Sequence, residues 1–179
     1  MKMMVKTATI GAALLLAGSA LQAASLGAWG PAKGDWDFTL GGGGASDKNF
    51  NINNGAFNAT VGYFITDALE VAVRQSILFS VLDDAADGFG GQTMLAVDYH
   101  FALGERWRPF VGASIGGIYG NQDTPDSGAA GLEVGVKYYA LQKTYVFGTF
   151  GWAWNFNNDQ GGDFEDGSFV YTAGVGFNF

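Results

Sequence analysis

The stretch YTAGVGFNF, residues 171–179, decides the fold. Its large side chains all have odd numbers, and small or polar residues stand between them: Tyr171, Val175, Phe177 and Phe179. Alternation with a period of two places one set of side chains on one face of a β-strand and the other set on the opposite face. The stretch therefore predicts an amphipathic strand that ends in an aromatic residue.

The same alternation occurs in seven earlier segments, each of which has apolar residues at every second position. The eight apolar sets begin at Trp36, Phe57, Leu69, Leu95, Val111, Leu132, Val146 and Phe169. The 29 glycines are too many for a helical protein and indicate strands and turns. An even number of antiparallel strands is what closed single-chain membrane barrels have. We therefore expect an all-β fold, an eight-stranded antiparallel up-and-down transmembrane β-barrel.

The connections between the expected strands alternate in length. Three are short, at residues 66–68, 102–108 and 140–144. The other four are longer and polar, at residues 43–55, 81–91, 120–128 and 157–168. Short turns at one end and long loops at the other are typical of outer-membrane barrels, in which the turns face the periplasm and the loops face the outside.

The strand face opposite the apolar set carries charged residues among many small ones. We expect these charged residues to form an interior polar network: Asp37, Glu70, Arg74, Asp98, His100, Glu133 and Lys137. A soluble barrel with an apolar ligand cavity is the alternative, because alternation alone does not say which face is inside. The apolar set is aromatic near the strand ends and aliphatic between them, which favours a barrel with girdles at both membrane interfaces.

The first residues of the chain have the features of a secretory signal peptide. Two lysines, Lys2 and Lys6, precede an apolar run at residues 8–17, and small residues follow up to Ala24. The apolar run is shorter than the roughly 20 residues that a transmembrane helix needs. We expect residues 1–23 to be a cleaved signal peptide and residues 24–179 to be the barrel domain, located in the cell outer membrane.

Composition excludes several classes of protein. Removing Lys2 and Lys6 with the leader leaves seven basic residues against 17 acidic ones, which argues against nucleic-acid binding. The 48% of hydrophobic residues and 15% of charged residues indicate an ordered chain. The absence of cysteine excludes disulfides and thiolate metal sites. We expect no cofactor.

The C-terminal residues Thr172, Gly174, Phe177 and Phe179 resemble the signal by which the barrel-assembly machinery recognises outer-membrane barrels. Together with the alternation, they make the chain similar to the small eight-stranded barrels of the OmpA transmembrane domain and the OmpX family. The segment RPFVGA, residues 108–113, resembles a strand start common in that group. The resemblance implies an integral outer-membrane protein whose partners are membrane lipid, lipopolysaccharide and, during insertion, the assembly machinery. Because the sequence ends with the eighth strand, we expect no role that depends on a peptidoglycan-binding domain.

The lumen of an eight-stranded barrel is narrow enough for side chains to fill it. We expect Arg74 to lie opposite Asp98 in a buried ion pair, with the other charged residues extending the network so that each buried charge has a partner. This pattern favours a structural polar plug. A narrow pore for ions or small solutes is the alternative.

Catalysis would depend on His100, the only histidine. Asp98 shares its face, but a hydrolase also needs a nucleophile within hydrogen-bond reach of the base. The acyl-ester hydrolases among such barrels carry a serine two residues after the histidine, where this chain has Ala102. We therefore expect no enzyme and assign no catalytic residue, although modification of lipid A remains a less favoured alternative.

Three of the expected loops carry nine acidic residues at one rim of the barrel: Asp83, Asp84, Asp87, Asp123, Asp126, Asp159, Asp163, Glu165 and Asp166. Carboxylates bind divalent cations, but residues 157–163 lack the spacing of a calcium-binding loop, so we assign no metal site. The acidic loops keep the surface solvated, and binding of an extracellular ligand is their alternative role. We therefore expect a structural or surface-interaction protein.

Overall fold

The computed structural model describes residues 29–46, 53–80, 88–120, 126–156 and 167–179. These residues form eight strands: β1 (Trp36–Ser46), β2 (Asn53–Phe64), β3 (Leu69–Ser80), β4 (Gly88–His100), β5 (Trp107–Gly120), β6 (Ser127–Tyr139), β7 (Thr144–Asn155) and β8 (Gly167–Asn178). No helix within these ranges is long and apolar enough to cross a bilayer.

The eight strands form one closed barrel. Each strand pairs antiparallel with its neighbours in sequence, and β1 also pairs with β8. At the seam, Trp36 N donates to Phe179 O at 2.8 Å, and Phe179 N donates to Trp36 O at 3.0 Å. Closure leaves no strand edge, as the bilayer interior requires. The barrel fold expected from the alternation is thus confirmed.

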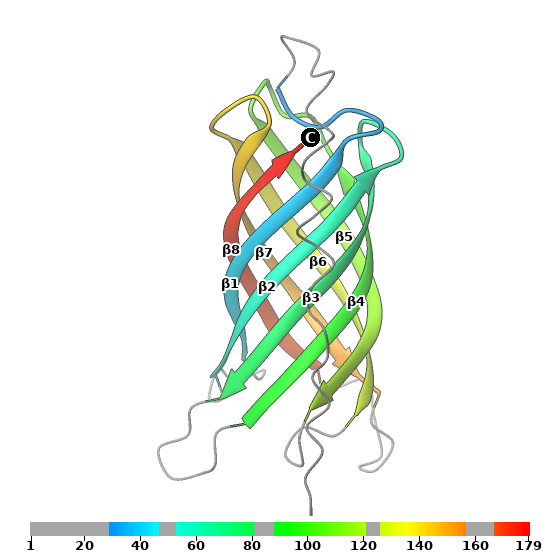
Figure 1. Ribbon diagram of the computed structural model, residues 1–179, viewed down its shortest axis with the longest axis vertical. Helices are drawn as coiled ribbons and strands as arrows, with labels where there is room; N and C mark the ends of the chain where they lie inside the picture. Colours follow the sequence, from blue (N-terminus) through cyan, green and yellow to red (C-terminus); the bar gives the residue numbers. More distant parts are fainter. Residues whose placement is uncertain (1–28, 47–52, 81–87, 121–125, 157–166) are drawn as a thin grey trace, which may run out of the picture.

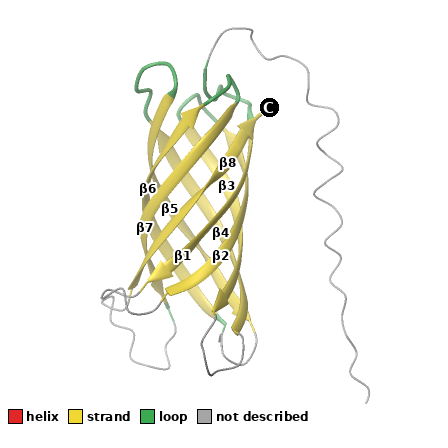
Figure 2. Ribbon diagram, turned by 90° about the vertical axis from the view of Figure 1, so that its left-hand side faces the viewer, coloured by secondary structure: helices red, strands yellow, loops and turns green. Residues whose placement is uncertain are grey.

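The two ends of the barrel differ. The C-terminus and the three short turns lie at one end, which we call the turn end, and the opposite ends of the strands form what we call the loop end (Figure 1). In a view turned by 90°, strands also form the wall of the barrel (Figure 2).

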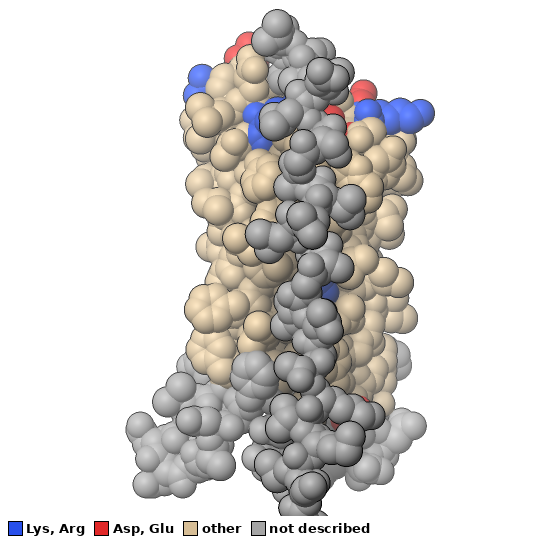
Figure 3. All heavy atoms as spheres, in the orientation of Figure 1, with Lys and Arg blue, Asp and Glu red and all other residues tan. Residues whose placement is uncertain are grey.

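The apolar side chains face outward. Leu95 and Ile115, in the middle of β4 and β5, are 60% and 61% exposed, whereas the inward Asp37 and Glu70 are buried. Most charged atoms visible in Figure 3 gather at the turn end, and the wall below them is nearly free of charge. The barrel is therefore inside out, with its polar set inside, and the alternative of an apolar ligand cavity inside the barrel is wrong.

Aromatic rings pair across neighbouring strands at both ends of the outer surface. The pairs are Trp36 with Tyr63 and Trp107 with Tyr138 at the turn end, and Phe57 with Phe79 and Trp152 with Phe169 at the loop end, with ring centroids 4.6–5.6 Å apart. Such rings suit the two membrane interfaces, where an apolar body meets a wet surface.

The first strand is longer than expected. It continues through a run of glycines to Ser46, so residues 43–46 belong to a strand and not to a loop. A Cβ atom at Gly43 would overlap the backbone oxygen of Tyr171 on β8, whereas one at Gly42 would meet nothing closer than 3.8 Å. At Gly43, glycine therefore allows β1 and β8 to approach each other and does not mark a turn.

The register between β3 and β4 also differs from the expectation. Glu70 lies opposite Asp98, and Arg74 lies opposite Met94. Ser80 pairs with Gly88, so the connection is shorter than the expected loop at residues 81–91. The observed register thus differs from the expected one by four residues. Because four is an even number, each side chain keeps its predicted face.

Candidate functional site

Lys137 on β6 lies at the centre of a buried polar network in the turn-end half of the lumen. Its Nζ donates to Asp37 Oδ2 at 2.8 Å and to Glu70 Oε2 at 3.0 Å. The side chains of all three residues are at most 5% exposed. The ammonium therefore bridges β1, β3 and β6 across the barrel, and its two carboxylate partners share one positive charge.

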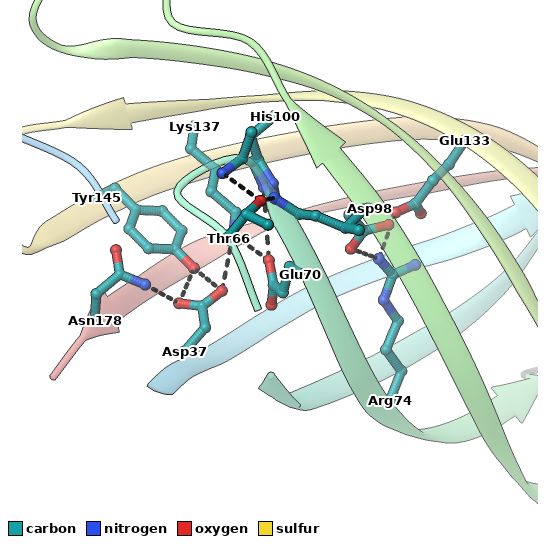
Figure 4. A network of polar contacts seen from close by, with 12 residues as sticks. Asp37, Thr66, Glu70, Arg74, Asp98, His100, Glu133, Lys137, Tyr145 and Asn178 are labelled. Carbon is teal, nitrogen blue, oxygen red and sulfur yellow. Dashed lines mark hydrogen bonds and ion pairs between the residues drawn. The ribbon is translucent and has the colours of Figure 1, made fainter. Parts of the chain in front are cut away.

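Two further side chains, Tyr145 and Asn178, bond to Asp37 (Figure 4), and a third bonds to Asn178. The hydroxyl of Tyr145 donates to both carboxylate oxygens, at 2.6 and 2.7 Å, and Asn178 Nδ2 donates to Oδ1 at 2.8 Å. The hydroxyl of Tyr139 in turn donates to Asn178 Oδ1 at 2.6 Å. A buried carboxylate is tolerated only when it is bonded in this way.

The sequence analysis did not include these three residues in the network. Tyr139 shares the parity of Lys137, and Asn178 shares the parity of the small residues on β8. Parity was therefore the available indication, but the charged residues alone were predicted to form the network.

His100 at the end of β4 lies between two aromatic rings. Its ring centroid is 5.2 Å from that of Phe64 and 5.0 Å from that of Phe110. Its Nε2 lies 3.6 Å from Glu70 Oε2, and neither ring nitrogen has a hydrogen-bond partner within the described ranges. The hydrogen bond between imidazole and nucleophile that a hydrolase needs is thus not formed there.

Arg74 on β3 forms a second cluster nearer the middle of the barrel. Its Nη2 lies 2.5 Å from Asp98 Oδ2 on β4 and 2.6 Å from Glu133 Oε1 on β6. Arg74 and Asp98, which the sequence analysis expects to pair, thus meet despite the different register, because the long arginine side chain spans the offset. All seven residues of the interior polar network face one lumen, where four carboxylates accompany Arg74 and Lys137.

A cavity of about 130 Å³ lies beyond Arg74 toward the loop end. Hydroxyl and amide side chains line much of it, including Thr39, Asn58, Thr60, Ser76, Gln92 and Thr172. Ser76 Oγ donates to Asn58 Oδ1 at 2.6 Å, and Asn58 Nδ2 donates to Thr172 Oγ1 at 3.3 Å. The lumen is therefore filled in its turn-end half and hollow farther along.

The four predicted assembly-signal residues lie along β8 and its end. Thr172 lines the cavity, and a Cβ at Gly174 would overlap the backbone oxygen of Leu40 on β1. Phe177 faces outward, and its ring centroid lies 5.6 Å from that of Phe179. Both rings thus belong to the girdle at the turn end.

Of the nine acidic loop residues, only Asp126 is described, and it is exposed directly before β6. The other eight lie outside the described residues: Asp83, Asp84, Asp87, Asp123, Asp159, Asp163, Glu165 and Asp166. The expected signal peptide at residues 1–23 also lies outside them. The loop patch and the leader therefore stay predictions.

The chain is similar in sequence and fold to outer-membrane barrels. A family model described as the OprF membrane domain matches residues 3–179. The N-terminal β-barrel domain of Pseudomonas aeruginosa OprF is 22% identical, with 82% of this chain and 98% of that chain covered and a TM-score of 0.59. Neisserial surface protein A is 16% identical, with 82% and 98% covered and a TM-score of 0.64. OprG from Pseudomonas aeruginosa is 14% identical, with 86% and 99% covered and a TM-score of 0.59.

Proposed function

Because this chain belongs to the OprF membrane domain family and is an integral β-barrel of the cell outer membrane, we propose that it is a structural and surface-interaction protein with a plugged interior. The observation that carries the proposal is the buried network around Lys137. This network fills the lumen at the turn end, which faces the periplasm in such barrels.

The packing around the network supports a plug. Phe64, Tyr139 and Tyr145 all point inward at the turn end, and each is 0% exposed. Lys137 passes close to the rings of Phe64 and Tyr145, with its Nζ 5.4 and 4.8 Å from their centroids. An ion or solute would have to separate these rings and break buried, charged hydrogen bonds to pass.

The network also suits a structural role, because it joins strands that are not neighbours in the sheet. Asp37 on β1, Glu70 on β3 and Tyr145 on β7 all bond within one cluster. Removing one partner of a buried ion pair is strongly destabilising, since it leaves a charge without compensation. The plug thus holds the barrel cross-section fixed. Binding of other molecules is then the role of the outer surface.

The proposed partners follow from the surface. The outward apolar wall and its girdles suit membrane lipid and lipopolysaccharide, and the exposed ring of Phe177 beside the half-buried Phe179 suits recognition by the barrel-assembly machinery. We assign binding of an extracellular ligand to the acidic loops on the strength of their sequence.

Planar-bilayer recording tests the plug. Folded protein, identified by its shifted gel mobility before boiling, is expected to give no discrete conductance steps, and so is Arg74→Ala. Reproducible steps in the wild type that change size in Arg74→Ala would favour the narrow pore and refute the plug.

Mass spectra of lipid A test the assignment as a non-enzyme. Cells with and without the gene are expected to give identical lipid A spectra. A mass difference that depends on His100 would identify an enzyme instead.

A further inference from the structure

The segment before β1, residues 29–35, crosses the mouth of the barrel at the turn end (Figure 1). It leads into β1, yet Trp29 O accepts a hydrogen bond from Arg108 Nη2 of β5 at 2.7 Å. The guanidinium carbon of Arg106, just before β5, lies 4.1 Å from the centroid of the Trp29 ring. In a closed barrel of eight strands, β5 is four strands from β1 in either direction. The segment must therefore span the opening from one wall to the other.

The turn between β6 and β7 holds the segment near its start and at its end. Gly30 N donates to Gln142 O at 3.0 Å. Lys143 Nζ donates to Gly30 O at 3.2 Å and to Asp35 Oδ2 at 2.5 Å. One lysine thus fastens two points of the segment.

The turn between β2 and β3 holds its other side. Lys33 N donates to Asp67 Oδ1 at 2.7 Å, and Gly34 N donates to Phe64 O at 2.8 Å. All three turns of this end, or the strand ends beside them, therefore contact residues 29–35.

Two glycines give the segment its shape. Gly30 and Gly34 have φ angles of 98° and 95°, in the left-handed region that favours glycine. A Cβ atom at Gly30 would lie 2.9 Å from the guanidinium of Arg108. The sequence WGPAKGD, residues 29–35, thus follows a specific path across the mouth.

We propose that residues 29–35 are a lid that controls access from the periplasm to the interior plug, and that Arg106, Arg108 and Lys143 hold it closed. The inference rests on the plugged interior proposed above. The contacts that hold residues 29–35 are polar and lie at the solvent-facing mouth of the barrel. The strands, in contrast, are held by continuous ladders of backbone hydrogen bonds. Segments of this kind open at lower free energy than the barrel that carries them.

A single cysteine beneath the lid can report its opening, because the chain has no cysteine of its own. Phe64→Cys suits this purpose, since Phe64 is fully buried and the substitution removes no side-chain hydrogen bond. Because it also removes one ring of the plug, every lid variant is compared with this same background. In this background, Arg108→Gln and Lys143→Gln each weaken the lid. Lys33→Gln is the matched control, because the exposed side chain of Lys33 has no bond or ion pair to the described residues.

Two readouts are compared in folded protein: amide hydrogen exchange of residues 29–35, and the labelling rate of the cysteine by a charged methanethiosulfonate reagent. Loss of a hydrogen bond to a charged group is expected to raise both rates about tenfold in Arg108→Gln and Lys143→Gln. Lys33→Gln is expected to match the background.

Unchanged hydrogen exchange in Arg108→Gln and Lys143→Gln would overturn the claim that these two residues hold the lid closed. Faster exchange with unchanged labelling would overturn the lid and leave the plug standing. If the Phe64→Cys background were labelled as fast as an exposed Leu141→Cys control, both the lid and the plug would be overturned. If the wild type conducted and labelling still depended on the lid residues, the plug alone would be overturned.

Discussion

Lys137→Met should destabilise the barrel more than any other single removal of a charge. Methionine keeps most of the side-chain volume but removes the ammonium that bonds to Asp37 and Glu70. Asp37 keeps its bonds from Tyr145 and Asn178, whereas Glu70 loses the hydrogen bond from the Lys137 ammonium. Breaking a buried pair from one side costs about 3–5 kcal/mol. We expect a loss of this size in the free energy of unfolding.

The assay is urea unfolding in lipid vesicles, followed by tryptophan fluorescence, with gel mobility before boiling as the check for a folded barrel. A triple variant, Lys137→Met with Asp37→Asn and Glu70→Gln, removes the carboxylate charges as well. Because neutral replacement of a buried ionic group is often tolerated, the triple variant should regain most of the lost stability. A change below about 1 kcal/mol in Lys137→Met, or no recovery in the triple variant, would refute the electrostatic account of the plug.

Two further predictions test the seam and the lipid face by the same unfolding assay. Gly43→Ala should destabilise by about 1–3 kcal/mol, because its Cβ would overlap the backbone of Tyr171, whereas Gly42→Ala should have little effect; equal effects would contradict the close approach of β1 and β8. Leu95→Arg should cost about 2–4 kcal/mol, because it places a cation against the lipid chains. The control is Leu103→Arg in a turn, which is similarly exposed and should cost far less; a similar cost at both positions would argue against the assigned membrane span.

The alternation predicted which way each side chain faces, but it could not predict which residues lie opposite each other. Arg74 was expected opposite Asp98 and lies opposite Met94. A period of two is unchanged by a slip of two or four residues, so only the length of the connection fixes the register. The two side chains meet because arginine is long enough to cross that distance.

Residue type alone does not predict the place of a residue that serves two purposes. The prediction begins a loop at Gly43, whereas the glycines from Gly43 onward continue β1 and let β8 approach. Tyr139 and Tyr145 were passed over for the interior, because the other aromatic rings of this chain mostly suit the lipid face. The crossing of residues 29–35 depends on contacts with three separate turns, and no local pattern predicts such contacts.

The plug has a consequence for the order in which the barrel forms. Its hydrogen bonds join residues far apart in the sequence: Asn178 to Asp37 across 141 positions, Tyr145 to Asp37 across 108 and Lys137 to Asp37 across 100. Contacts of such large sequence separation form slowly, because a long loop must close first. Strand β8 supplies Asn178 and completes the seam, so the network around Asp37 cannot be finished until the last strand has joined the first. The barrel should therefore hold water throughout its assembly and expel it from the turn end only in the final step.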